Sequence, residues 1–62
     1  MTGTISGWGL VGNHIWGKME VHTSRPDLVG KECRTSAVKT ILMVDGKRIA
    51  HTNSGSVYLL ID

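Results

Sequence analysis

An Asp-Gly pair at residues 45–46 lies between two runs of residues that favour β-strands, 38–44 and 47–52. Asp-Gly in this setting is the strongest short-range signal for a β-hairpin, because a tight type I′ turn needs positive φ at both central residues. Gly46 adopts positive φ without steric cost, and Asp45 tolerates it better than most residues do. The sequence therefore predicts a hairpin centred on this pair.

A third strand-like run, residues 56–61, follows a second turn signal at residues 53–55. Consecutive strands joined by short turns pair with each other in antiparallel fashion. The C-terminal half of the chain is therefore expected to form a three-stranded meander.

The N-terminal half contains further strand-like segments. Residues 4–11 and 14–22 are separated by Gly12-Asn13, a plausible two-residue turn, and residues 31–36 begin another strand that either bends into the run at 38–44 or turns before it. No stretch shows a sustained helical period with caps, so no long helix is expected. Five or six short strands at this spacing are typical of a small β-barrel or sandwich. At this length an SH3-like or OB-like barrel is the economical solution, and the absence of an expected helix between strands favours the SH3-like form. We predict an all-β fold: one SH3-like barrel of antiparallel strands, formed by residues 1–62 as a single domain.

The segment 14–22 shows the alternation of a half-buried strand. One face is expected to be buried and carries Ile15, Gly17, Met19 and Val21. The other face is expected to be exposed and carries His14, Trp16, Lys18, Glu20 and His22.

The chain has 62 residues and a single cysteine, Cys33, so no intrachain disulfide is possible. A chain this short buries only about 60% of its unfolded surface, and small scaffolds usually need a further stabilising device. We expect that device to be assembly into a homo-oligomer. One unpaired cysteine is typical of a reducing compartment, the N-terminus lacks the pattern of a signal peptide, and the longest apolar run is too short to span a membrane, so a cytoplasmic protein without membrane contact is expected.

Neither catalysis nor metal binding is favoured. The three histidines, His14, His22 and His51, lack the compact spacings of zinc ligands, and on a straight strand the first two would lie roughly 26 Å apart. Cys33 has no obvious neighbouring base, since Glu32 and Arg34 point to the opposite side of a strand. We expect no catalytic residues, no metal ligands and no cofactor, and we do not expect an enzyme.

Two groups of residues are candidates for ligand binding, each with a structural alternative. Trp16 and Lys18 lie on the same strand face, as a stacking platform for a base beside a positive charge would require, and Tyr58 could also stack. The alternative is that Trp8, Trp16 and Tyr58 fill the core or a subunit interface. The Ser/Thr-rich turns could form a phosphate-binding nest of hydroxyls and backbone N–H groups, with arginines and lysines supplying charge, or they could simply be turn residues.

The second half of the chain carries four spaced motifs: Pro26-x-Leu28-x-Gly30-Lys31, Thr35-Ser36-x-Val38-x-x-Ile41, Thr52-x-Ser54 and Tyr58-x-Leu60. In these motifs, residues 26–62 resemble a type of small β-barrel accessory protein encoded by bacteriophages and prophages. The resemblance implies a short protein made in the cytoplasm of an infected bacterium. Such proteins often counter host defences by inhibiting a protein or by sequestering nucleotide signals.

The net charge of +2 permits an anionic partner without requiring one. We therefore predict a homo-oligomeric binding module for a nucleotide or nucleic acid. Its expected ligand-binding residues are Trp16, Lys18, Arg34, Thr35, Ser36, Lys39, Arg48, Asn53, Ser54 and Tyr58. The alternative is an interaction protein that covers a surface of a host or phage protein, for instance by adding a strand to a sheet edge.

Overall fold

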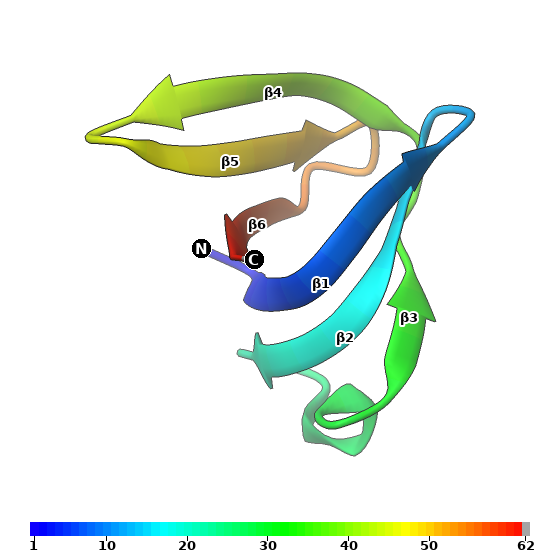
Figure 1. Ribbon diagram of the computed structural model, residues 1–62. Helices are drawn as coiled ribbons and strands as arrows, with labels where there is room; N and C mark the ends of the chain where they lie inside the picture. Colours follow the sequence, from blue (N-terminus) through cyan, green and yellow to red (C-terminus); the bar gives the residue numbers. More distant parts are fainter. Residues whose placement is uncertain (62) are drawn as a thin grey trace.

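The computed structural model describes residues 1–61, which form six strands and one 3-10 turn (Figure 1). In chain order the elements are β1 (Gly3–Val11), β2 (His14–His22), η1 (Pro26–Leu28), β3 (Glu32–Arg34), β4 (Val38–Val44), β5 (Lys47–Thr52) and β6 (Val57–Ile61). The all-β prediction is confirmed. No helix in the described part of the chain is long and apolar enough to cross a membrane.

The hairpin predicted at Asp45-Gly46 is present. Both residues have positive φ, 52° and 77°, as a type I′ turn requires. β4 pairs with β5 and β5 with β6, each antiparallel, so the predicted C-terminal meander is also confirmed.

All six strands belong to one sheet with the order β3-β2-β1-β6-β5-β4. β1 and β6 lie side by side and run parallel, so the expectation of a purely antiparallel sheet is wrong at this pair. These two strands are not neighbours in the chain. No turn between them sets their relative direction, and turn chemistry was the basis of the antiparallel prediction.

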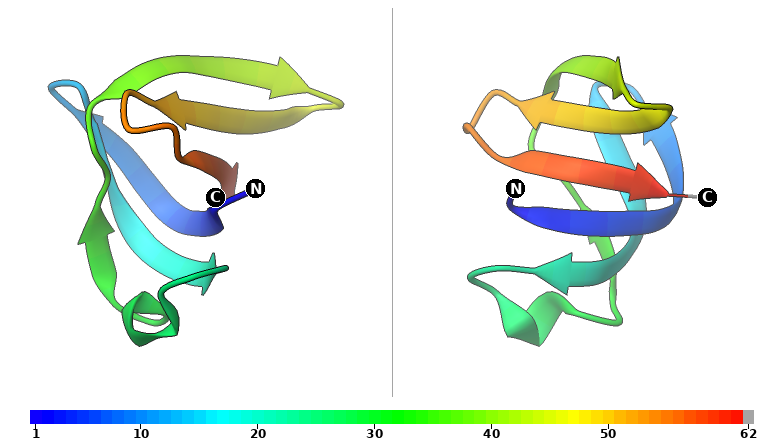
Figure 2. Two further views of the ribbon diagram at one scale, coloured as in Figure 1. Left: turned by 180° about the vertical axis from the view of Figure 1, so that it is seen from behind. Right: turned by 90° about the vertical axis from the view of Figure 1, so that its left-hand side faces the viewer.

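The sheet is strongly curled, so that the β4–β5 hairpin lies across from β1 and β2 (Figures 1 and 2). Its two edge strands, β3 and β4, are consecutive in the chain and are joined by residues 35–37. Hydrogen bonds hold this connection in place. The Val38 N–H donates to the Asn13 carbonyl at 2.5 Å, and the Asn53 N–H donates to the Ala37 carbonyl at 2.8 Å. The result is a barrel-like sheet with edges at β3 and β4.

The core lies on the concave side of the sheet. Its buried hydrophobic residues are Ile5, Ile15, Met19, Ala50, Tyr58 and Leu60. Gly17 is also buried, and a Cβ atom placed on it would lie 2.5 Å from Ile5 Cγ2 and 2.8 Å from the Ser6 carbonyl oxygen. The close approach of β1 to β2 therefore depends on a glycine at this position.

A bulge in β2 changes the predicted face of one residue. Thr4 pairs with Val21 and Ile5 pairs with Met19, so Glu20 is an extra residue on β2. The alternation shifts by one position after Met19, and Val21 is 52% exposed instead of buried. His22 correspondingly comes within 6.2 Å of the Tyr58 ring, measured between ring centroids.

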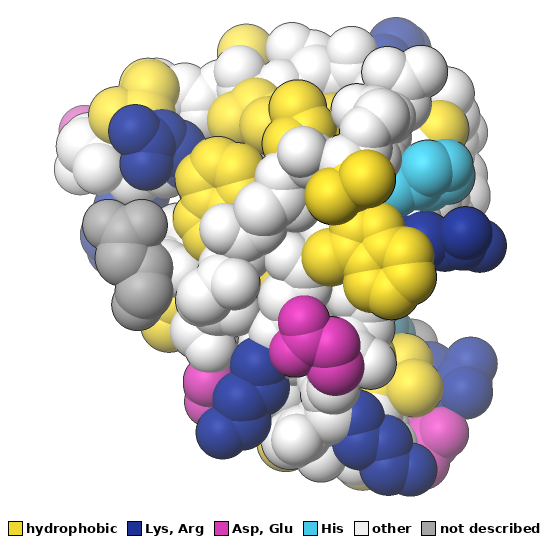
Figure 3. Space-filling view, turned by 45° about the vertical axis from the view of Figure 1, so that its right-hand side comes forward, with side chains coloured by type: hydrophobic (Ala, Val, Ile, Leu, Met, Phe, Trp, Pro, Cys, Tyr) yellow, Lys and Arg dark blue, Asp and Glu magenta, His cyan; other side chains and the backbone are white. Residues whose placement is uncertain are grey.

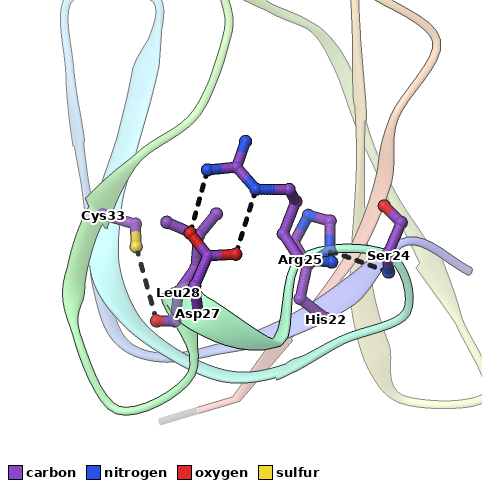
Figure 4. A network of polar contacts seen from close by, with 6 residues as sticks. All are labelled: His22, Ser24, Arg25, Asp27, Leu28 and Cys33. Atoms are coloured by element: carbon purple, nitrogen blue, oxygen red, sulfur yellow. Dashed lines mark hydrogen bonds and ion pairs between the residues drawn. The ribbon is translucent and has the colours of Figure 1, made fainter.

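The loop between β2 and β3 is held by local polar contacts (Figure 4). The guanidinium of Arg25 donates two hydrogen bonds to the Asp27 carboxylate, at 3.1 and 3.0 Å, and His22 Nδ1 accepts from the backbone N–H groups of Ser24 and Arg25. The hydrogen bond from Arg25 lowers the pKa of the Asp27 carboxyl below its ordinary value, and the same bond raises the pKa of Arg25. These contacts stabilise the loop without forming a cavity.

Candidate ligand-binding surface

Trp16 is the most prominent aromatic side chain on the surface, with 42% of it exposed. It lies on the convex side of β2 because its chain neighbours, Ile15 and Gly17, are buried on the concave side. Lys18, two residues along the strand, points the same way and is exposed. The predicted proximity of this aromatic ring and this charge follows directly from the strand geometry.

Arg34 joins the pair from the adjacent strand. Trp16 and Arg34 are directly opposite each other in the β2–β3 ladder, and the guanidinium carbon of Arg34 lies 5.8 Å from the centroid of the indole ring. This distance is within the range of a cation–π contact, which at an exposed site contributes about 0.5–1 kcal/mol. We call Trp16, Lys18 and Arg34 the Trp16 shelf.

The other flank of the shelf is open. Gly9 on β1 is the residue opposite Trp16, and a Cβ placed on Gly9 would meet nothing within 4 Å. A flat ligand would therefore meet no side chain from β1 at this point. On the β3 side, Glu32 stands opposite Lys18 and offsets part of its charge. Sequence reasoning missed the contributions of Gly9 and Glu32, since both depend on strand register.

A second Arg–Trp pair lies elsewhere. The guanidinium carbon of Arg48 is 5.7 Å from the centroid of the Trp8 ring. Trp8 is half-buried and packs against the core, so it lies on the opposite side of the sheet from Trp16. One small ligand on the Trp16 shelf would therefore not reach Arg48.

Two other predicted ligand-binding residues, Tyr58 and Lys39, lie apart from the Trp16 shelf. Tyr58 is only 8% exposed and belongs to the core, in agreement with the structural alternative for its ring. Lys39 is exposed on the edge strand β4, where the register shifts between Val38 and Thr40. Among the described residues, neither Tyr58 nor Lys39 makes a hydrogen bond or a cation–π contact with Trp16.

The hydroxyl-bearing candidates do come together. The turn after β5 meets the connection between β3 and β4, and the Ser54 hydroxyl donates to the Ser36 hydroxyl at 3.1 Å. Thr52 Oγ1 lies 3.0 Å from Ser54 Oγ and also accepts from the Ser56 N–H at 3.1 Å. Thr35 Oγ1 accepts from the Ile15 N–H.

These contacts favour the structural alternative for the turns. A phosphate-binding nest needs free backbone N–H groups. The N–H groups of Asn53, Gly55 and Ser56 already donate to acceptors within the protein. Thr35 and Thr52 are buried, so their hydroxyls satisfy the backbone rather than face a ligand. We therefore assign this cluster to holding the two turns together.

Replacing the buried Thr52 by valine is expected to lower the free energy of unfolding by about 1–3 kcal/mol, since the partly buried Ser56 N–H loses its acceptor. Urea denaturation followed by circular dichroism measures this loss. Thr40→Val, on an exposed position of β4, is the control and should change stability little. Equal effects in the two variants would contradict the role given to Thr52.

No enclosed pocket is found in the described part of the chain. Residues 1–61 also contain no group of three or more His, Cys, Asp or Glu side chains that could hold a metal ion. The Trp16 shelf is an open surface, formed by the exposed residues Trp16, Lys18 and Arg34.

Comparisons with known proteins give no family assignment. No protein-family model, no curated protein and no solved structure matches this chain. The functional interpretation therefore comes from the residues themselves.

Proposed function

We propose that this protein is a non-enzymatic, homo-oligomeric binding module that holds a nucleotide or nucleic acid on the Trp16 shelf. The observation that carries the proposal is the exposed indole of Trp16 with two basic side chains beside it, Arg34 across the ladder and Lys18 along the strand. A base would stack on the indole, and the basic side chains would contact phosphate.

The charge favours a short ligand over a long one. The whole chain has a net charge of +2, and Glu32 lies within the basic part of the shelf. Long DNA or RNA is usually bound by a broader basic surface, because each neutralised phosphate adds to the affinity. A mononucleotide or a cyclic dinucleotide needs only one or two cationic side chains.

The biological setting is part of the same proposal. The resemblance of residues 26–62 to phage accessory proteins supports a role in an infected bacterium. There, a nucleotide-binding module would act by sequestering a signal of the host defence.

One observation favours the second candidate function, an adaptor or inhibitor that binds another protein. β4 is an edge strand, and three consecutive apolar residues on it are exposed: Leu42, Met43 and Val44. An exposed apolar edge is a template for pairing with another strand. This candidate predicts no response to nucleotides and a specific protein that copurifies from the host.

The test is calorimetric titration of the protein with a mononucleotide, a cyclic dinucleotide and a single-stranded oligonucleotide, together with thermal melting. Binding to the folded state raises Tm. Arg34→Ala should weaken binding about tenfold, as expected for loss of one charged hydrogen bond of about 1.5 kcal/mol. Because Arg34 is exposed, the variant should fold normally.

Arg48→Ala is the matched control, since it removes the guanidinium of the other Arg–Trp pair. It should leave the affinity unchanged if the shelf is the site. Equal affinity of the wild type and the Arg34 variant would contradict the site. No binding of any of the three probes would favour the protein-binding candidate.

A further inference from the structure

The two halves of the sheet differ in how apolar residues are distributed over their faces. In β2, apolar side chains such as Ile15 and Met19 point to the core, and polar side chains such as Lys18 point outward. In β6 the sequence is Val-Tyr-Leu-Leu-Ile, which is apolar on both faces apart from the tyrosine hydroxyl. Strands with continuous apolar sequences are typical of sheets covered on both sides.

The strand register shows where the second apolar face lies. Tyr58 and Leu60 are buried on the concave side, so Leu59 points to the convex side. Leu59 is directly opposite Ile49 on β5, and Ile49 is directly opposite Leu42 on β4. Residues opposite one another in a ladder share a face. These three side chains therefore form a continuous apolar row across three strands.

Residues two positions along each strand extend this row. We call the resulting surface the convex apolar face. Its apolar residues are Leu42, Val44, Ile49, Val57, Leu59 and Ile61, and the polar residues Thr40, Lys47 and His51 lie on the same face. Three of these residues are largely exposed: Leu42 by 47%, Val44 by 46% and Ile61 by 40%. Figure 3 shows a different side of the molecule, the right-hand side of Figure 1 turned forward, where hydrophobic side chains lie among basic, acidic and histidine side chains.

We propose that the convex apolar face binds the same face of a second copy of this chain, so that two curled sheets pack back to back as a dimer. This inference specifies the homo-oligomer included in the proposed function, but it does not depend on the identity of the ligand. The Trp16 shelf is on β2 and β3, and β1 separates these strands from β6, β5 and β4, which carry the convex apolar face. The dimer would therefore leave the shelf accessible.

The charge distribution supports a second copy as the occupant. The central row, Leu42, Ile49 and Leu59, contains no charged residue. Lys47, opposite Val44, and His51, opposite Val57, lie on the same face to either side of this row. Two identical faces therefore meet without burying like charges at their centres. Apolar centres with charges at the rim are typical of protein interfaces.

Size supports the same occupant. The described structure exposes 3876 Å² of surface and has only six buried hydrophobic residues, a small core for an independent fold. A standard interface takes about 800 Å² from each partner, about a fifth of this surface. The convex apolar face spans three of the six strands.

The dimer is tested by sedimentation velocity and by thermal melting over a range of protein concentrations, without any nucleotide. The wild type should sediment at twice the chain mass of 6.7 kDa, and its Tm should rise with concentration. A wild type that sediments as 6.7 kDa at about 100 μM, with a constant Tm, would overturn the proposal.

Leu42→Lys places a charge in the central row and should weaken dimerisation about 30-fold, as expected for a residue at the centre of an interface. Met43→Lys is the matched control, since Met43 is the next residue on β4 but points to the opposite side of the strand. The control should remain a dimer. Dissociation of both variants to the same extent would show that the copies meet through the β4 edge and would overturn face-to-face packing.

The dimer and the ligand site are separable in these measurements. Nucleotide affinity of the Leu42 variant reports on the shelf alone, and sedimentation of the Arg34→Ala variant reports on the dimer alone. A wild-type dimer that binds no nucleotide would keep this inference and contradict the proposed ligand. A monomer that binds nucleotide would support the proposed ligand and contradict the dimer.

Discussion

Gly17→Ala is expected to lower the free energy of unfolding by about 3 kcal/mol, which is the upper part of the usual range for overpacking a core. The added Cβ would lie 2.5 Å from Ile5 Cγ2, 2.8 Å from the Ser6 carbonyl oxygen and 3.1 Å from the Trp8 Cα atom. Two of these three atoms belong to the backbone of β1, so relief requires β1 and β2 to separate. Because a domain of this size is stabilised by only about 3–5 kcal/mol, a large part of the protein should be unfolded.

Gly9→Ala is the control, because it adds the same methyl group to the same pair of strands. Gly9 is exposed, and a Cβ there meets nothing within 4 Å. Urea denaturation of the two variants, followed by circular dichroism, should give a large shift of the midpoint for Gly17→Ala and a small one for Gly9→Ala. Similar shifts in the two variants would contradict the close contact at Gly17.

The local parts of the fold were predictable because their signals lie in neighbouring residues. Asp45-Gly46 determines a turn type, and the turn type determines that β4 and β5 pair in antiparallel fashion. The parallel contact between β1 and β6 joins residues more than 50 positions apart, such as Gly3 and Tyr58. No turn encodes that contact. It arises from burial of the concave faces of the two halves of the sheet against each other.

The bulge in β2 is a second feature of the fold that could not be predicted from the sequence. The alternation from Ile15 to Met19 correctly predicts the buried face, but the extra residue at Glu20 reverses it for Val21. A bulge is set by how two strands accommodate each other's length and bend. The sequence of β2 alone contains no sign of it.

In the candidate site, too, local relationships were predictable and those that depend on tertiary structure were not. The pairing of Trp16 with Lys18 follows from the period of one strand and was predictable. The addition of Arg34 requires the register of β3 against β2. The separation of Arg48 from this group requires the curl of the sheet, which brings Arg48 over Trp8. Residue type alone predicted Trp16, Lys18, Arg34 and Arg48 as ligand contacts. The tertiary structure is needed to separate Arg48 from the other three.

Trp16→Ala is expected to weaken nucleotide binding about 5- to 150-fold, since stacking of one base on an aromatic side chain contributes about 1–3 kcal/mol. The variant should stay folded, because the indole is 42% exposed and lies outside the buried core. Calorimetric titration with the tightest-binding of the three probes measures the affinity. Circular dichroism and melting establish that the fold is kept.

Two further substitutions separate stacking from simple apolar contact. Trp16→Phe keeps an aromatic ring and should retain part of the affinity, whereas Trp16→Leu keeps apolar surface without a ring and should behave like alanine. Ligand binding should also quench the fluorescence of Trp16 but not of Trp8, which is half-buried against the core on the opposite side of the sheet. Quenching should therefore disappear in Trp16→Phe, where Trp8 is the one tryptophan left. Full affinity in the leucine variant, or unchanged quenching in the phenylalanine variant, would contradict stacking on the Trp16 shelf.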